Sequence, residues 1–306
     1  MRRLAAFVAV AALVPAAQAA TLRSPVQLGI FGSIDRFQSL TGQQSQVGHV
    51  IVGWGQSTFA QIWPTLGPVP MLGFDNGQGT MTMQALARGT GDAYLLAMSE
   101  SARGLGKPVY IRPFGEMNGH WNAYCAYDTN GTPRGIAYST ANFRKSFARI
   151  YLIMHGGPTV NATLKRLGLP PVSMEIPTNP FVKVIWNPQG YGSPDVPGNS
   201  AQAYYPGDRY VDVVGDDLYD IGGKAEFAAA DKLYKAHPSK PFSFPEWGLW
   251  GIDDPKFVQQ MATFVKSHPR TKLLSYFNAK PGSIFDLASK PKSLAAYKRY
   301  ILPLGR

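Results

Sequence analysis

The sequence contains a single cysteine, Cys125, among its 306 residues, so no disulfide bond can form within the chain. Its stability must therefore come from packing rather than from covalent cross-links. We expect Cys125 to be a packed side chain and not a catalytic thiol, because no base lies near it in the sequence. After residue 20, no segment approaches the roughly 20 uninterrupted apolar residues that a membrane helix needs. No membrane anchor is therefore predicted.

Three further patterns are missing. The 30 Lys and Arg residues against 19 Asp and Glu give a net charge of +11, but they are scattered and form no nucleic-acid module, so nucleic acid is not a predicted partner. Four histidines have no metal-ligand spacing with carboxylates, which predicts no metal and no other cofactor: His49, His155, His237 and His268. No Gly-rich phosphate loop follows the first apolar run, which disfavours the alternative of an open doubly wound sheet.

The amino terminus has the pattern of a cleaved signal peptide. Met1-Arg2-Arg3 precedes an apolar run from Leu4 to Val14, and small residues follow up to Ala20. We expect residues 1–20 to be removed and the mature chain, 21–306, to be secreted or periplasmic. Its net charge would then be +9, because Arg2 and Arg3 leave with the signal peptide. Such an excess suits contact with anionic polymers.

Short β-branched or aromatic runs alternate with segments of helical spacing. The eight candidate strands are Val26–Phe31, Val47–Trp54, Val69–Phe74, Val109–Phe114, Phe181–Trp186, Tyr210–Tyr219, Pro241–Glu246 and Lys272–Phe277. The clearest helical segments are Ala85–Leu105, Asn142–His155, Lys224–His237 and Pro255–His268. Eight strands, most of them separated by helical segments, in a mature chain of this length predict a (β/α)8 TIM barrel in a single domain, 21–306. We expect it to be a monomer.

Two glutamates end two of these strands. Glu116 follows the fourth candidate strand and Glu246 ends the seventh, and each precedes a loop that contains glycine. Barrel enzymes place their catalytic groups at such positions. A glycosidase needs one carboxyl held protonated, as an acid for the leaving oxygen, and one held ionised. The pair therefore predicts a glycoside hydrolase with a polysaccharide or oligosaccharide substrate.

Strand alternation predicts the neighbours of both glutamates. It would place Arg112 and Phe114 on the same face as Glu116, with the arginine holding a carboxylate or lowering its pKa. The same parity would place two phenylalanines, Phe242 and Phe244, beneath Glu246.

The segments around the glutamates resemble glycoside hydrolase family 26, the β-mannanase family. RPFGEMNGHW, residues 112–121, looks like that family's acid/base motif. YPGDRYVDVVGDDLYD, residues 205–220, is similar to its sixth strand, and PEWG, residues 245–248, resembles its nucleophile segment. The order and the strand positions match across most of the mature chain.

This resemblance implies a retaining endo-β-glycanase, most simply a β-1,4-mannanase, with Glu116 as acid/base and Glu246 as nucleophile. It also implies that Trp121 stacks on sugar and that Asp217 and Tyr219 line the same subsite, with the tyrosine hydroxyl near Glu246. Sugar clefts need aromatic side chains beside polar ones. The predicted substrate-binding residues are Arg112, Asn118, Trp121, Trp186, Asp217, Tyr219, Trp247 and Phe277.

One position departs from the family pattern. The family usually has histidine immediately before the acid/base glutamate, on the substrate side, and this chain has Gly115. The departure leaves the sugar and its linkage open. Two alternatives remain: a barrel that binds carbohydrate without cleaving it, and a glycanase for an acidic exopolysaccharide or cell-envelope glycan, which the positive charge favours.

Overall fold

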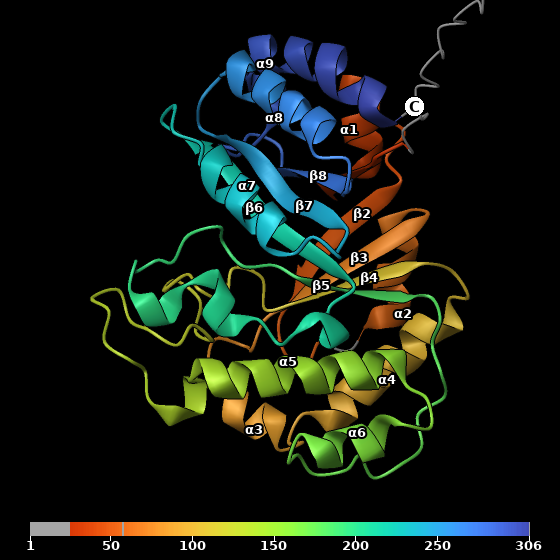
Figure 1. Ribbon diagram of the computed structural model, residues 1–306. Helices are drawn as coiled ribbons and strands as arrows, with labels where there is room; N and C mark the ends of the chain where they lie inside the picture. The colour runs from red at the N-terminus through yellow and green to blue at the C-terminus, as the bar shows by residue number, and fades with distance from the viewer. Residues whose placement is uncertain (1–24, 57, 306) are drawn as a thin grey trace, which may run out of the picture.

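The computed structural model describes residues 25–56 and 58–305, so the predicted signal peptide lies outside the described residues. Eight parallel strands close into a barrel in chain order (Figure 1). They are β1 Gln27–Gly32, β2 Val47–Val52, β3 Val69–Phe74, β4 Val109–Pro113, β5 Val182–Trp186, β6 Val213–Ile221, β7 Phe242–Trp250 and β8 Thr271–Ala279. The predicted (β/α)8 barrel is confirmed.

Helices surround the barrel on its outer face (Figure 1). They are α1 Ile34–Thr41, α2 Phe59–Ile62, α3 Met83–Ala87, α4 Asp92–Gly104, α5 Thr140–His155, α6 Val160–Arg166, α7 Phe227–Ala236, α8 Pro255–Ser267 and α9 Pro291–Ala296. None of the helices in the described part of the chain is both long and apolar enough to cross a membrane.

The core has two parts. The larger one fills the space between the strands and the surrounding helices. A smaller cluster from five strands fills the interior of the barrel, as the inward positions of a closed sheet must: Val47, Met71, Ile185, Val213 and Leu273. This apolar plug forms the floor on which the polar groups nearer the carboxyl ends of the strands lie.

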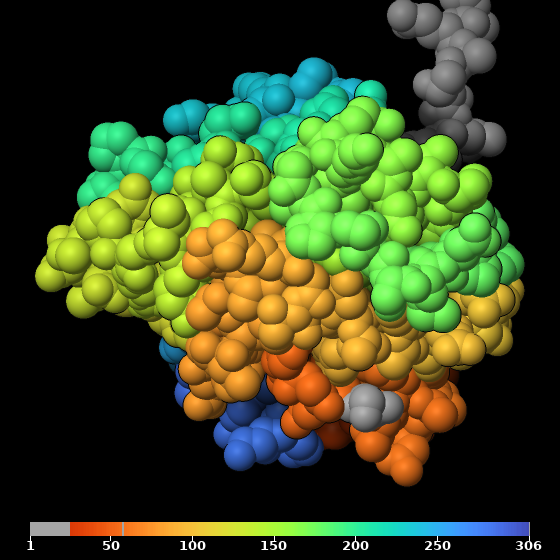
Figure 2. Space-filling model, turned by 90° about the horizontal axis from the view of Figure 1, so that it is seen from below, coloured from red at the N-terminus to blue at the C-terminus, as the bar shows by residue number. Residues whose placement is uncertain are grey.

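The longest connection between strands runs from β4 to β5 and contains α5 and α6. Seen from below, α6 in green and the orange segment of α3 and α4 lie side by side, and the olive segment that precedes α5 projects at the left edge (Figure 2). This long connection supplies the loop that follows Glu116, the first candidate catalytic residue.

The predicted helix Ala85–Leu105 is in fact two helices, α3 and α4. Gly89 lies between them in the left-handed region, at φ +94°, and a Cβ atom there would lie 3.1 Å from the carboxylate of Asp92. Asp92 in turn binds the fully buried guanidinium of Arg149 on α5, accepting from its Nε at 2.6 Å. The break between α3 and α4 therefore lies where Asp92 pairs with the buried charge of Arg149.

Replacing Asp92 with alanine is expected to lower the free energy of unfolding by about 3 kcal/mol, since it leaves the buried Arg149 without its anion. Urea unfolding would measure the change. Asp128→Asn is the matched control, because the pair of Asp128 with Arg134 is partly exposed and should contribute at most about 1 kcal/mol. Equal losses in the two variants would contradict the expectation.

Candidate active site

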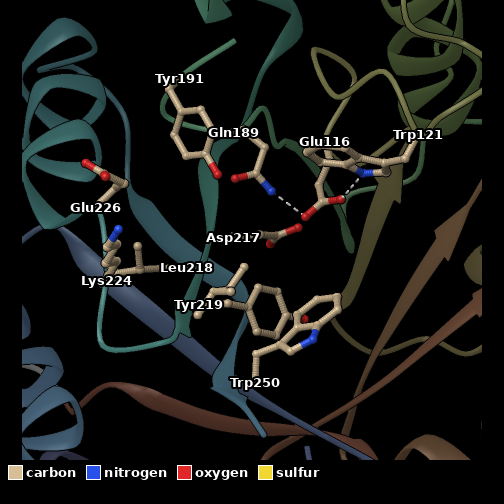
Figure 3. Close-up of a pocket in the computed structure, with 11 residues that line it drawn as sticks. Glu116, Trp121, Gln189, Tyr191, Asp217, Leu218, Tyr219, Lys224, Glu226 and Trp250 are labelled. Atoms are coloured by element: carbon tan, nitrogen blue, oxygen red, sulfur yellow. Dashed lines mark hydrogen bonds between the residues drawn. The ribbon is translucent and has the colours of Figure 1, made fainter. Parts of the chain in front are cut away.

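A cavity of about 370 Å³ opens at the carboxyl ends of β4 to β7. Figure 3 shows the side chains around it. It is lined by Glu116, Trp121, Gln189, Tyr191, Asp217, Leu218, Tyr219, Ile221, Lys224, Glu226 and Trp250. Glu116 and Asp217, which come from segments a hundred residues apart, lie close together at its base (Figure 3).

Glu116 lies in a tight turn directly after β4. Both Glu116, at φ +55°, and Phe114, at φ +53°, adopt the left-handed conformation that residues other than glycine rarely adopt. The turn is held from the next strand, because the backbone N–H of Glu116 donates to the carbonyl of Asn187 at 2.7 Å. Strained backbone of this kind clusters at functional sites, where the surrounding structure enforces it.

The side chain of Glu116 accepts two hydrogen bonds. The indole N–H of Trp121 donates to one carboxylate oxygen at 2.7 Å, and the amide of Gln189 donates to the other. The pKa of Glu116 is raised to about 6, first by burial and then by the charge of Glu246, while Arg112 and the two hydrogen bonds oppose the rise. Glu116 therefore holds its proton at higher pH than an ordinary glutamate.

Arg112, on β4 and almost fully buried, connects the acidic groups. Its guanidinium donates to Glu246 and to Asp217, and its Nε donates to the side chain of Asn187 at 2.7 Å. Burial alone would lower the pKa of Arg112, but the two carboxylates raise it above its ordinary value. One permanent cation thus lies among three carboxyl groups, which favours a proton on at least one of them.

Glu246 lies on β7, opposite Asp217 of the neighbouring strand β6. Its backbone N–H donates to Asp217 at 3.1 Å, and its carboxylate accepts from the hydroxyl of Tyr219 at 2.8 Å. Burial and the carboxylate charges raise the pKa of Tyr219 well above 10, so the hydroxyl remains a donor. Glu246 therefore receives hydrogen bonds from both Tyr219 and Arg112.

Asp217 and Tyr219 lie where the sequence predicted them, in the same cavity as Glu116. Burial is the main cause that raises the pKa of Asp217, and Glu246 and Glu116 add to it against the effect of Arg112. Its neighbour Asp216 accepts a hydrogen bond from the backbone N–H of Gly190 at 2.8 Å. Burial raises the pKa of Asp216 to about 8.

Strand alternation predicted the role of Arg112 correctly, because its guanidinium holds the carboxylates of Glu246 and Asp217. The predicted positions of three phenylalanines were wrong. Phe114 lies beyond the end of β4 and packs outward against Phe143 of α5. Phe242 and Phe244 both pack against Phe264 of α8, outside the barrel. The pairing of β7 with β8 shifts register between Phe244 and Trp247, and this irregularity turns Glu246 to the interior face.

Three predicted substrate-binding residues are buried and have no exposed surface that a substrate could contact. Trp247 is fully buried and stacks on Tyr297 outside the barrel, and Trp186 is fully buried against Tyr205. Each tryptophan directly follows a residue whose side chain faces the barrel interior. Because side chains alternate along a strand, both tryptophans point outward, toward the helices. Asn118 is also fully buried, because its amide binds the carbonyls of Gln189 and Tyr191 at 2.9 Å. It fixes the loop after β5 instead of contacting substrate.

Phe277 remains a candidate. It lies near the end of β8, partly exposed, stacked on Phe31 with the ring centroids 4.3 Å apart, and 6.0 Å from the ring of Tyr219. It therefore borders the site on the side of β8 and β1.

Trp121 is the most exposed of the predicted aromatic residues, at 51%. A Cβ atom on Gly119 would lie 2.9 Å from Cη2 of its indole ring, so the absence of a side chain at Gly119 makes room for the ring. Seven of the eleven residues that line this cavity were missed, among them Gln189, Tyr191 and Trp250. Gln189 and Tyr191 follow β5, and a search for polar and aromatic residues just past each strand would have found them.

Among residues 25–56 and 58–305, no group of three or more His, Cys, Asp or Glu side chains is arranged to hold a metal ion. Cys125 is buried, with its sulfur 3.6 Å from the side-chain oxygens of Asn199 and Tyr204, as expected for a packed residue.

No family model matches the sequence. Endoglucanase H of Acetivibrio thermocellus is 22% identical over 88% of this chain, which spans 29% of the length of that relative. A mannanase from Bacillus subtilis has a similar structure, with a TM-score of 0.60, 20% identity, and coverage of 91% of this chain and 86% of the mannanase. A GH26 β-mannanase from Bacteroides ovatus gives a TM-score of 0.58 and 17% identity, with coverage of 91% and 88%. The chain is therefore a (β/α)8 barrel with the fold of the GH26 β-mannanases, in agreement with the family resemblance of its motifs.

Proposed function

We propose that this chain is a retaining glycoside hydrolase of family 26 that cleaves a β-linked polysaccharide internally, most simply a β-1,4-mannan. The observation that carries the proposal is the contrast between two glutamates from β4 and β7. Glu116 has a raised pKa, and Glu246 receives hydrogen bonds from Arg112 and Tyr219. An acid and an ionised nucleophile are the two groups that glycoside hydrolysis requires.

In the first step, Glu246 attacks the anomeric carbon while Glu116 donates its proton to the departing glycosidic oxygen. The bond to the leaving sugar breaks, and a covalent glycosyl ester forms on Glu246. In the second step, Glu116, now ionised, takes a proton from water as the water attacks the same carbon and releases Glu246. The two inversions leave the configuration of the sugar unchanged.

The walls of the cavity suit a sugar chain. Trp121, Tyr191 and Trp250 are 51%, 45% and 46% exposed, which is high for large aromatic residues. Aromatic faces stack on the apolar faces of sugar rings, while the carboxylates and Gln189 can bind hydroxyl groups. An exposed lysine, Lys224, and an exposed glutamate, Glu226, also line the cavity. The net positive charge of the chain favours a second candidate substrate, an acidic polysaccharide.

The test is a reducing-end assay across galactomannan, glucomannan, xylan, mixed-linkage glucan and anionic polymers, with Glu246→Gln as the inactive control. We expect the wild type to release ends from a β-mannan. Activity confined to an anionic polymer and lost steeply with salt would favour the second candidate. Binding to a polymer without release of ends would instead indicate a carbohydrate-binding barrel. Export through residues 1–20 is also proposed, and amino-terminal sequencing of the mature protein would test it.

Replacing Trp121 with phenylalanine is expected to shift the pH dependence of kcat/KM. Phenylalanine keeps an aromatic ring but lacks the indole N–H that favours ionised Glu116, so the pKa of Glu116 rises above about 6. The acid is active when protonated, so the alkaline limb of the profile moves to higher pH. Trp250→Phe is the matched control, and it should leave that limb in place. An unshifted limb in Trp121→Phe would show that the hydrogen bond does not tune the acid.

A further inference from the structure

The backbone conformation at position 115 does not require glycine. The residues on either side of it, Phe114 and Glu116, have positive φ angles, whereas Gly115 is not among the left-handed residues of the chain. An alanine could therefore adopt its backbone conformation. The reason for glycine must lie in the space around it.

That space is filled by Arg112. A Cβ atom on Gly115 would lie 2.6 Å from Cζ and 3.0 Å from Nε of the arginine, closer than a side chain can approach. The guanidinium therefore lies against the backbone of the turn that carries Glu116. In this place it donates to Asn187, Asp217 and Glu246 at once. Any side chain at 115 competes for the volume that the guanidinium occupies.

We propose that Gly115 is a positioning residue: its missing side chain seats the guanidinium of Arg112 where that group can hold Glu246 and Asp217 together. The inference rests on the proposed function for its catalytic consequence. In this chain, a side chain at 115, histidine included, would take the space in which the Arg112 guanidinium lies. The residue before the acid thus acts on the nucleophile, through the arginine.

The atoms that a new Cβ would displace belong to the end of a flexible side chain. Gly115→Ala should therefore still fold, but with some loss of stability, because the buried guanidinium of Arg112 is pushed off its partners. We expect kcat to fall about 10-fold to 100-fold, as small misplacements of catalytic groups do, with KM nearly unchanged. Gly104→Ala is the matched control, because its Cβ would meet nothing within 4 Å.

A double-mutant cycle with Arg112→Lys separates positioning from a general effect of the added methyl group. Lysine lacks the planar fork that lies against Gly115. In the Arg112→Lys background, Gly115→Ala should therefore change kcat less than twofold. Independent, additive losses would overturn the inference, and so would a Gly115→Ala enzyme as active as Gly104→Ala.

Crystal structures of the wild type and Gly115→Ala decide the point even if no polysaccharide is cleaved. Displacement of the guanidinium from Glu246 and Asp217 supports the positioning role, and an unmoved guanidinium overturns it. Failure of the proposed function would appear separately, as absence of hydrolysis in the wild type, with Arg112 still displaced in the variant.

Discussion

Replacing Glu246 with glutamine is expected to lower kcat by about 10⁴-fold or more, on a polysaccharide and on an aryl glycoside alike. The amide is nearly the same size but a very poor nucleophile, so no glycosyl ester forms. It also turns an N–H toward one of the two donors, Arg112 or Tyr219, that now bind the carboxylate. Glu100→Gln, at an exposed position on α4, is the control for the chemical change itself.

Glu246→Ala adds a second readout. It removes the nucleophile and leaves a space beside the Arg112 guanidinium, where a small anion can bind. Azide is expected to restore cleavage of an activated aryl β-glycoside, with attack from the side of Glu246. The product would be the α-glycosyl azide, identified by NMR. Wild-type turnover in Glu246→Gln, with the fold confirmed by circular dichroism, would remove Glu246 from the mechanism.

The barrel could be predicted from the sequence because its signal is repeated. All eight apolar runs overlap the observed strands, and β3 matches to the residue. Parallel strands buried on both faces give such continuous runs. Both glutamates could also be predicted to lie at one rim, because the carboxyl ends of parallel strands meet there.

The direction of side chains near the rim could not be predicted in the same way. Alternation holds only while the strand stays regular, and β4 ends at Pro113 while the pairing of β7 shifts near Glu246. The errors at Phe114, Phe242 and Phe244 all follow from these two irregularities. Trp247 was predicted to bind substrate because it is next to Glu246 in the sequence. In a regular strand, however, the side chains of two adjacent residues face opposite sides of the sheet.

The contact between Gly115 and Arg112 was also beyond reach of the sequence. A glycine in a motif can signal a turn, a positive φ angle or a close approach, and only coordinates separate these causes. Here the neighbours carry the positive φ angles and the glycine supplies the space. The departure of position 115 from the pattern of family 26 could be read from the sequence, but the contact with Arg112 required the fold.

Replacing Glu116 with alanine is expected to affect the two steps of the reaction differently, depending on whether the leaving group of the substrate needs a proton. On a polysaccharide, whose leaving sugar needs protonation, kcat/KM should fall about 10³-fold. On a dinitrophenyl glycoside, whose leaving group departs without a proton, kcat/KM should stay close to the wild-type value. On that substrate kcat should still fall, and KM with it, because water then lacks its general base and the glycosyl ester accumulates.

The pH profile and azide complete the assignment of Glu116. In the wild type, kcat/KM on the polysaccharide should decline above about pH 6 as Glu116, with its raised pKa, loses its proton. In Glu116→Ala the residual kcat/KM on the polysaccharide should lack this alkaline limb. Azide should speed turnover of the ester without a base and yield the β-glycosyl azide, opposite in configuration to the product of Glu246→Ala. If both variants gave the same anomer, one of the two glutamates would be misassigned, because azide would be entering on a single face of the sugar.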